Sequence, residues 1–156
     1  MAVDMFLKLD GIDGESKDDK HLRHIEVMSF SWGMNQKFVN GDQGANEVHD
    51  FSFSHKVDKA SPLLMVHCAT GKHIPSATLR VVRGGTKPVE YMQYKMTDVM
   101  VSSLQHGGHQ AGNVPTDQFS LNFSKVEFSY RFQKGDGTLE PPIVVEVSNP
   151  DRQVTQ

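Results

Sequence analysis

The stretch Phe119–Phe132 (FSLNFSKVEFSYRF) alternates apolar and polar residues along almost its whole length. Alternation with a period of two is typical of a β-strand that buries one face. The apolar positions are odd-numbered up to Phe123 and even-numbered from Val126 onward. Because a strand presents alternate residues to opposite faces, this change of parity indicates a β-bulge near Lys125, where the strand would bend.

The same alternation extends over most of the chain. The segment Val89–Leu104 also changes parity partway, which indicates a second bulge near Thr97. Gly84-Gly85 and Gly135-Asp136-Gly137 are typical of the hairpin turns that join such strands. Shorter alternating runs cover 4–9, 24–34, 48–57, 76–83 and 143–147. We therefore predict a mainly all-β fold, a tight β-barrel of about seven to nine strands, in which the bent strands curl one sheet around one core.

One segment, Ser61–Gly71, carries the start and stop signals of a short α-helix. Ser61 is a favourable N-cap, Pro62 suits the first helical position, and Gly71 suits the left-handed position after the last turn. Apolar residues occupy most of the positions between them, so little of this helix is polar. A short helix of this kind is expected either to be sandwiched inside the protein or to be covered by another chain.

Length and composition limit the class of protein. A chain of 156 residues is expected to form one domain, 1–156. Its 16 basic and 19 acidic residues give a net charge of −3 without a basic run, so nucleic-acid binding is not expected. No apolar run is long enough for membrane insertion. The first residues do not form a secretory signal, and the single Cys68 suits a reducing compartment, so we expect synthesis in the cytoplasm.

The segment 35–47 carries no sustained period and is rich in Gly and Asn. An unstructured connection of 13 residues is uncommon inside a small domain and is often functional, so this extended loop is a candidate contact arm. A flexible hairpin tip is the alternative interpretation. The residues proposed to make contacts are Asn40, Gly41, Asp42, Gly44 and Asn46.

The sequence shows no complete catalytic or metal-binding motif. His21 with His24 and His106 with His109 are the most suggestive of its eight histidines, since imidazole is a common metal ligand. Both pairs lie in or beside loops, with no neighbouring cysteine and no helix to align two ligands. A nucleophile elbow and a phosphate-binding loop are also missing from the sequence. We therefore predict a protein that is not an enzyme and that binds no metal or cofactor.

Several motifs resemble one known family. These are MAVDMFLK at 1–8, SWG at 31–33, DKASP at 58–62, ATGKHIP at 69–75, DVMVSS at 98–103 and LNFSK at 121–125. In this order they are similar to the haemolysin-coregulated protein (Hcp) family of the bacterial type VI secretion system. The resemblance implies a tight β-barrel with a helix at its side, assembled as a homohexameric ring around a wide channel.

The same resemblance implies partners and a route out of the cell. Rings of this family stack into a tube inside a contractile sheath, a spike protein caps the tip, and the tube is expelled with effector proteins in its channel. Secretion without a signal peptide would follow from this. The extended loop at about 35–47 then becomes an arm that reaches a neighbouring subunit or ring.

Ser29 and Ser31, with Gly33, form a small and weakly polar face beside Phe30 and Trp32. A channel wall that must hold varied cargo loosely would need such a face, so we predict that Ser29 and Ser31 line the channel. An ordinary solvent-facing position is the alternative for both serines.

Two interpretations from other classes stay open. One is a monomeric β-barrel module that binds a peptide or a sugar. The other is a metal-dependent enzyme built on His21, His24, His106 and His109. Metal content and oligomeric state distinguish both from a ring-forming subunit.

Overall fold

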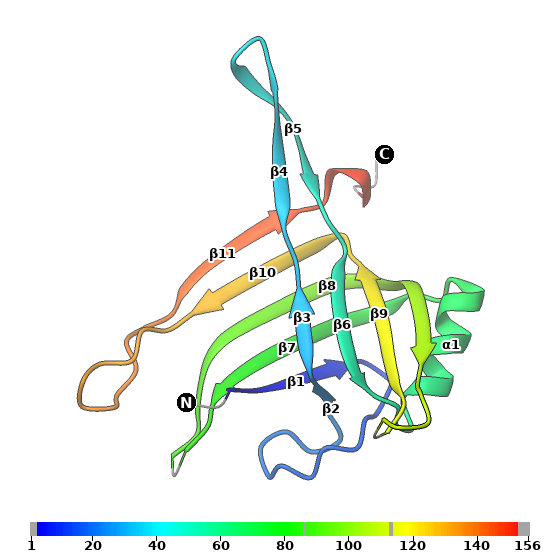
Figure 1. Cartoon of the computed structure of the whole chain (residues 1–156). Helices are drawn as coiled ribbons and strands as arrows, with labels where there is room; N and C mark the ends of the chain where they lie inside the picture. The colour runs from blue at the N-terminus through cyan, green and yellow to red at the C-terminus, as the bar shows by residue number, and fades with distance from the viewer. Residues whose placement is uncertain (1–2, 86, 113, 153–156) are drawn as a thin grey trace.

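The computed structural model describes residues 3–85, 87–112 and 114–152, and these residues form eleven strands, one α-helix and a 3-10 turn (Figure 1). The first strands are β1 (Val3–Leu9), β2 (Ile25–Val27), β3 (Ser29–Ser31), β4 (Met34–Val39), β5 (Asp42–Val48) and β6 (Phe51–Lys56). After α1 (Ser61–Thr70) come β7 (Ile74–Arg83), β8 (Val89–Gly107), β9 (Thr116–Asn122), β10 (Lys125–Tyr130), β11 (Ile143–Ser148) and the turn η1 (Pro150–Arg152).

Nine of the strands form one antiparallel sheet in the order β2-β1-β7-β8-β9-β6-β3, with β10 and β11 branching from β8. The two ends of this path, β2 and β3, are consecutive in the chain and separated by Met28 alone. At Met28 the chain stops pairing with β1 and starts pairing with β6, since its N–H donates to the Ser54 carbonyl at 2.8 Å. The sheet therefore curls around a core without a ladder between its end strands. The all-β class is confirmed, but the expected tight barrel is corrected to an open, strongly curled sheet.

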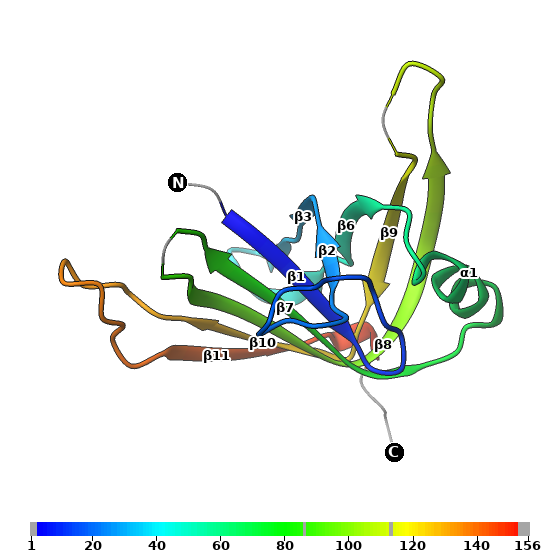
Figure 2. The same ribbon diagram turned by 90° about the horizontal axis from the view of Figure 1, so that it is seen from below.

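The 19-residue strand β8 gives the sheet its shape. Its first part lies between β7 and β10, and its last part pairs with β9. Met96 and Val99 are both fully buried, so the parity of the strand changes between them, as predicted near Thr97. The change occurs at Asp98, whose φ of 53° is unusual for a residue with a side chain. Figure 2 shows the two parts of β8 running in different directions.

Side chains from two other segments hold this bend. The Arg152 guanidinium donates to the Asp98 carbonyl at 3.1 Å and to its Oδ2 at 3.0 Å. His73 Nδ1 lies 2.6 Å from Asp98 Oδ1. The hydrogen bond with His73, assisted by the charge of Arg152, lowers the pKa of Asp98 below its usual value. The carboxylate thus ties η1 and the start of β7 to the bend.

The predicted parity change near Lys125 is also present, but it is a break between two strands rather than a bulge. Phe123 and Val126 are both buried, and the chain leaves β9 and enters β10 between them. Ser124 bridges the gap, because its N–H and its hydroxyl both donate to the Thr97 carbonyl at 3.0 Å.

The segment 35–47 is an ordered hairpin of β4 and β5, so the prediction of an unstructured connection is wrong. Asn40 and Gly41 form its two-residue turn with φ values of 52° and 81°, which is the geometry that an Asn-Gly pair favours. A register shift between Gln36 and Phe38 interrupts the alternation, which is why the sequence shows no sustained period. A side chain at Gly44 would come within 2.0 Å of the Lys37 carbonyl, so the bulged hairpin requires a glycine there.

Helix α1 packs against β8 at the side of the sheet. Gly71 ends it in the left-handed conformation, with φ of 69°, and donates its N–H to the His67 carbonyl at 2.9 Å, as predicted. The predicted N-cap is wrong: Ala60 occupies that position, and the Ser61 hydroxyl is used elsewhere. The outer side of α1 exposes Leu63, Met65 and Val66.

A buried polar cluster joins α1 to the sheet. Asp117 of β9 is fully buried and accepts hydrogen bonds from the Ser61 hydroxyl and from His106 of β8. His55 of β6, also fully buried, has its Nε2 3.0 Å from Asp117 Oδ2 and its Nδ1 3.7 Å from Asp58 Oδ2. Neither His55 nitrogen makes a hydrogen bond of good geometry, although its Nε2 lies close to the Asp117 carboxylate. Four segments therefore depend on one carboxyl group.

Replacing Asp117 with alanine is expected to lower the free energy of unfolding by about 3 kcal/mol, because it leaves His55 and Ser61 buried beside a cavity. Urea unfolding followed by Trp32 fluorescence measures the change. Asp19→Ala, at an exposed loop position, is the control and should unfold like the parent chain. Equal midpoints for Asp117→Ala and the control would show that the cluster contributes nothing to stability.

Candidate functional site

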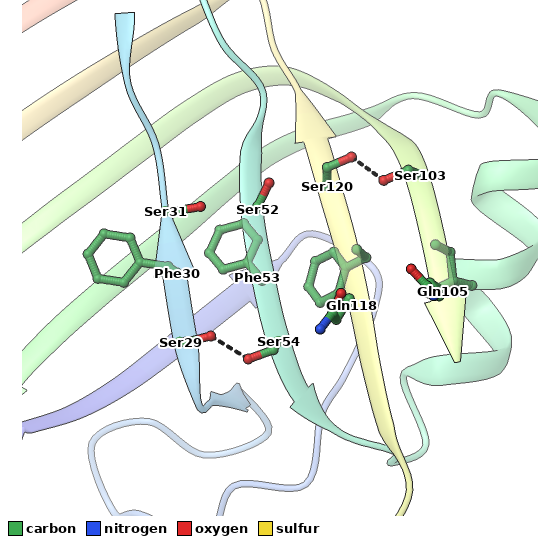
Figure 3. A pocket seen from close by; sticks show the side chains of 12 residues that line it. Ser29, Phe30, Ser31, Ser52, Phe53, Ser54, Ser103, Gln105, Gln118 and Ser120 are labelled. Atoms are coloured by element: carbon green, nitrogen blue, oxygen red, sulfur yellow. Dashed lines mark hydrogen bonds between the residues drawn. The ribbon is translucent and has the colours of Figure 1, made fainter. Parts of the chain in front are cut away.

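The strands β3, β6, β9 and the last part of β8 lie side by side and present two chemically different faces (Figure 3). Aromatic residues of these strands, such as Phe53 and Phe119, point into the core. The residues between them are short and polar. On this outer face, which we call the hydroxyl face, lie Ser29, Ser31, Ser52, Ser54, Ser103, Gln105, Gln118 and Ser120.

Strand register explains why these side chains meet. Ser29 lies opposite Ser54, and Ser31 lies opposite Ser52. The rows continue across β9 and into β8, where a register shift between Val101 and Ser103 places Ser103 opposite Ser120. Each strand thus adds hydroxyl or amide groups at the same level as its neighbour.

The hydroxyl face is hollowed, with a volume of about 420 Å³, and the residues that line it carry no charged side chain. Several of its hydroxyls are paired across strands: Ser29 with Ser54 at 2.5 Å and Ser103 with Ser120 at 2.5 Å. Paired hydroxyls compete less for an outside ligand than free ones do. The face can therefore form weak, adaptable polar contacts, but it lacks an acid, a base or a nucleophile with an activating partner.

Aromatic packing beneath the hydroxyl face keeps it in place. Trp32, Phe51, Phe53 and Phe119 stack in succession with ring centroids 5.6, 5.3 and 5.2 Å apart. The Trp32 indole N–H also donates to the His49 carbonyl at 2.9 Å, which fixes the chain where β3 leads into the hairpin. The outer hydroxyls thus stand on a dense core.

Both serines predicted to line a channel, Ser29 and Ser31, lie on this face and are exposed. Their partners on β6, β8 and β9 were missed by the sequence analysis, because each strand taken alone shows serines at ordinary solvent-facing positions. The signal that could have found them is the repeated Phe-Ser alternation in β6 and β9, combined with antiparallel pairing of those strands.

The five predicted arm residues lie apart from the hydroxyl face, on the hairpin of β4 and β5. Asn40 and Gly41 form its tip, Asp42 begins β5, and Gly44 and Asn46 follow along that strand. Figure 1 shows this hairpin projecting beyond the upper end of the sheet.

The histidines considered as metal ligands do not gather into one site. His21 is buried against the Phe6 ring and has its Nδ1 2.7 Å from Asp18, while burial lowers the pKa of nearby His24. His106 is bound to Asp117, and His109 lies in the following loop. Within 3–85, 87–112 and 114–152, no group of three or more His, Cys, Asp or Glu side chains is placed so that it could hold a metal ion.

The same described ranges contain no helix with the length and apolar character needed to cross a membrane.

Comparisons with known proteins agree with this fold. The family model described as "Type VI secretion system effector, Hcp" matches residues 6–130. The chain is 42% identical over 146 residues to Protein hcp1 of Pseudomonas aeruginosa, and the match covers 90% of each protein.

Solved structures agree as well. Hcp1 from Salmonella typhimurium is similar with a TM-score of 0.81 and 38% identity, over 95% of each chain. A type VI secretion system effector from Yersinia pestis is similar with a TM-score of 0.78 and 34% identity, over 93% of this chain and 99% of that one. The resemblance found in the motifs thus extends to the family model, to a curated relative and to the three-dimensional fold: the chain belongs to the Hcp family of the type VI secretion system.

Proposed function

We propose that the chain is a non-catalytic subunit of the type VI secretion tube, which forms hexameric rings whose channel is lined by the hydroxyl face. The observation that carries this proposal is the hollowed, uncharged face that spans four strands and rests on a dense aromatic core. A protein channel needs a wall that holds different proteins weakly and releases them, and short paired hydroxyls satisfy that need. Its family membership supports the same role.

Unpaired sheet edges support self-association. In the described residues β11 pairs only with β10, and β3 pairs only with β6, so each has an open backbone edge. The side chains of Ile143, Val144 and Val145 on β11 are all more than half exposed. Open edges and exposed apolar strands are typical of surfaces that pair with another chain. When one copy offers its edge to a different surface of the next, the contact is head-to-tail and can close into a ring.

The remaining partners follow from the tube role. Rings stack on one another, a spike protein caps the stack, a contractile sheath surrounds it, and effector proteins occupy the channel. The chain is then made in the cytoplasm and leaves the cell as part of the expelled tube. The exposed outer side of α1, with Leu63, Met65 and Val66, is available for contacts outside the channel.

Native mass spectrometry of the purified chain tests the proposal directly. We expect a predominant hexamer, and electron microscopy should show rings with an open centre. A protein that remains a single chain at every concentration would favour the monomeric binding module instead. Stoichiometric metal in the same sample would favour the metalloenzyme.

Ser31→Gln places a longer side chain in the hollow of every subunit, so it should obstruct cargo without disturbing the core. We expect intact rings that retain about fivefold less co-purifying effector protein than wild-type rings. Ser31→Ala, which removes the hydroxyl and fills no space, and Thr70→Gln, on the exposed helix, are matched controls that should retain cargo. Unchanged cargo recovery with Ser31→Gln would contradict a channel-lining position.

Gly44→Asp should weaken ring stacking more than ring formation, because a side chain at Gly44 collides with the Lys37 carbonyl and distorts the hairpin arm. Sedimentation measures hexamers and longer stacks in the same sample. Ala45→Asp adds the same charge at the neighbouring exposed position and controls for charge alone. If Gly44→Asp reduces hexamers and stacks equally, the hairpin is not a stacking arm.

A further inference from the structure

His55 of β6 is fully buried and has no part in the hydroxyl face. Its Nε2 lies 3.0 Å from Asp117 Oδ2, and its Nδ1 lies 3.7 Å from Asp58 Oδ2. The Phe119 ring stands at 89° to the imidazole, with the two ring centroids 5.3 Å apart. Both nitrogens of a buried ring therefore have a carboxylate oxygen as a near neighbour.

These neighbours bear on how many protons the ring carries. A neutral imidazole has one N–H and one nitrogen with a lone pair, whereas an imidazolium has an N–H on both nitrogens. A neutral His55 would turn its lone pair toward one of the two carboxylates, and the two groups would repel each other. A doubly protonated ring turns an N–H toward each carboxylate, and its positive charge offsets a buried negative one.

Asp117 has the hydrogen-bond partners of an ionised carboxylate. The Ser61 hydroxyl oxygen accepts the Asp58 N–H at 3.1 Å, so the hydroxyl proton is free to point at Asp117 Oδ2. The other oxygen, Oδ1, accepts a hydrogen bond from His106 Nδ1. An ionised carboxylate is a pure acceptor, which fits both contacts. Burying such a group is costly unless a cation lies beside it.

The other charged groups around this cluster lie nearer the surface. The His106 side chain is 42% exposed, so water screens any charge on it. Lys56 and Lys59 are exposed. Glu15 accepts the Lys59 N–H at 2.7 Å and adds a further acid on the outer side. Within the described residues none of these groups is a buried cation, so the buried imidazole is the group best placed to offset Asp117.

Helix α1 depends on this cluster because the helix buries little else. Ser61 and Leu64 are the buried residues among its ten, and Ser61 is the one bound to Asp117. Just before the helix, Asp58 Oδ1 accepts the Ala60 N–H at 2.8 Å. A segment with few buried contacts opens locally at a lower cost than the core does. A loss of charge balance in the cluster should therefore act first on α1, which lies beside β8 (Figure 1).

We propose that His55, doubly protonated between Asp58 and Asp117, clamps α1 to the sheet, and that loss of its proton releases the helix. In the released state the ring meets water, so the docked state holds one proton more at neutral pH. The clamp is fully effective below about pH 6.5, where a histidine in water is itself protonated, down to the pH at which the carboxylates take up protons. It is lost as the pH rises past the point at which the docked ring gives up its proton. This inference does not depend on the proposed tube function.

Solid-state NMR of the full chain with ¹⁵N-labelled histidine measures the proton count. A ring nitrogen that carries a proton and one that carries a lone pair resonate far apart, and the signals missing from the His55→Gln chain belong to His55. At about pH 7.5 we expect two N–H signals from His55. One N–H signal together with one lone-pair signal from this ring overturns the proposal.

Asp58→Asn is a second variant that retains an acceptor for the Ala60 N–H and removes one negative charge. We expect a lone-pair signal to appear at about pH 7.5, because the ring then lacks one of the two charges that hold its second proton. Asp19→Asn, an exposed loop change, is the matched control and should leave the histidine spectrum unchanged. A spectrum of Asp58→Asn identical to that of the control overturns the clamp.

Hydrogen exchange followed by mass spectrometry tests the release of the helix. After correction for the intrinsic exchange rate at each pH, the opening of α1 should increase by up to about tenfold per pH unit as the pH rises above neutral, since opening releases one proton. Peptides from β7 are the internal control and should not change. An opening of α1 that is independent of pH, or one that β7 shares equally, overturns the proposal.

Discussion

The bend of β8 at Asp98 is the constraint on which the rest of the structure depends. Before the bend the strand belongs to the sheet of β7 and β10, and after it the strand supports β9 and α1. Asp98 occupies a conformation that costs energy for any residue other than glycine, and the contacts from Arg152 and His73 offset that cost. Because one strand serves both parts of the sheet, the direction of the hydroxyl face relative to the remaining strands is fixed by a single residue.

Alternation in β3, β6 and β9 couples the core to the outer surface. Each phenylalanine that packs inward leaves a short polar residue facing outward, so the aromatic stack and the hydroxyl face arise from the same backbone geometry. The inward-pointing aromatic side chains and the outward-pointing polar side chains lie on opposite sides of the sheet, so the packing of the core does not disturb the hydroxyl face. Hydroxyls pair across strands on this face, and the residues that line it carry no charge.

Much of this could be predicted from the sequence, and the failures have physical causes. The strands, the C-terminal end of α1 and the two parity changes follow from local patterns, which short-range geometry determines. The prediction of a closed barrel was wrong. Closure of the sheet depends on whether its end strands, β2 and β3 on either side of Met28, pair with each other, and no local sequence pattern indicates that. The hairpin was missed because a bulge at Lys37 hides the period, although Asn40-Gly41 is a strong turn signal. The eight-residue hydroxyl face was only partly found, since it exists only once strand register aligns four separate segments.

Strand β11 has a consequence for the chain on its own. Three successive β-branched side chains, Ile143, Val144 and Val145, stand on a strand that, in the part of the chain the structure describes, pairs along one edge alone. Such a segment is a template for cross-β aggregation as well as for correct pairing. The isolated chain is therefore prone to misassembly through β11 for as long as this edge stays unpaired.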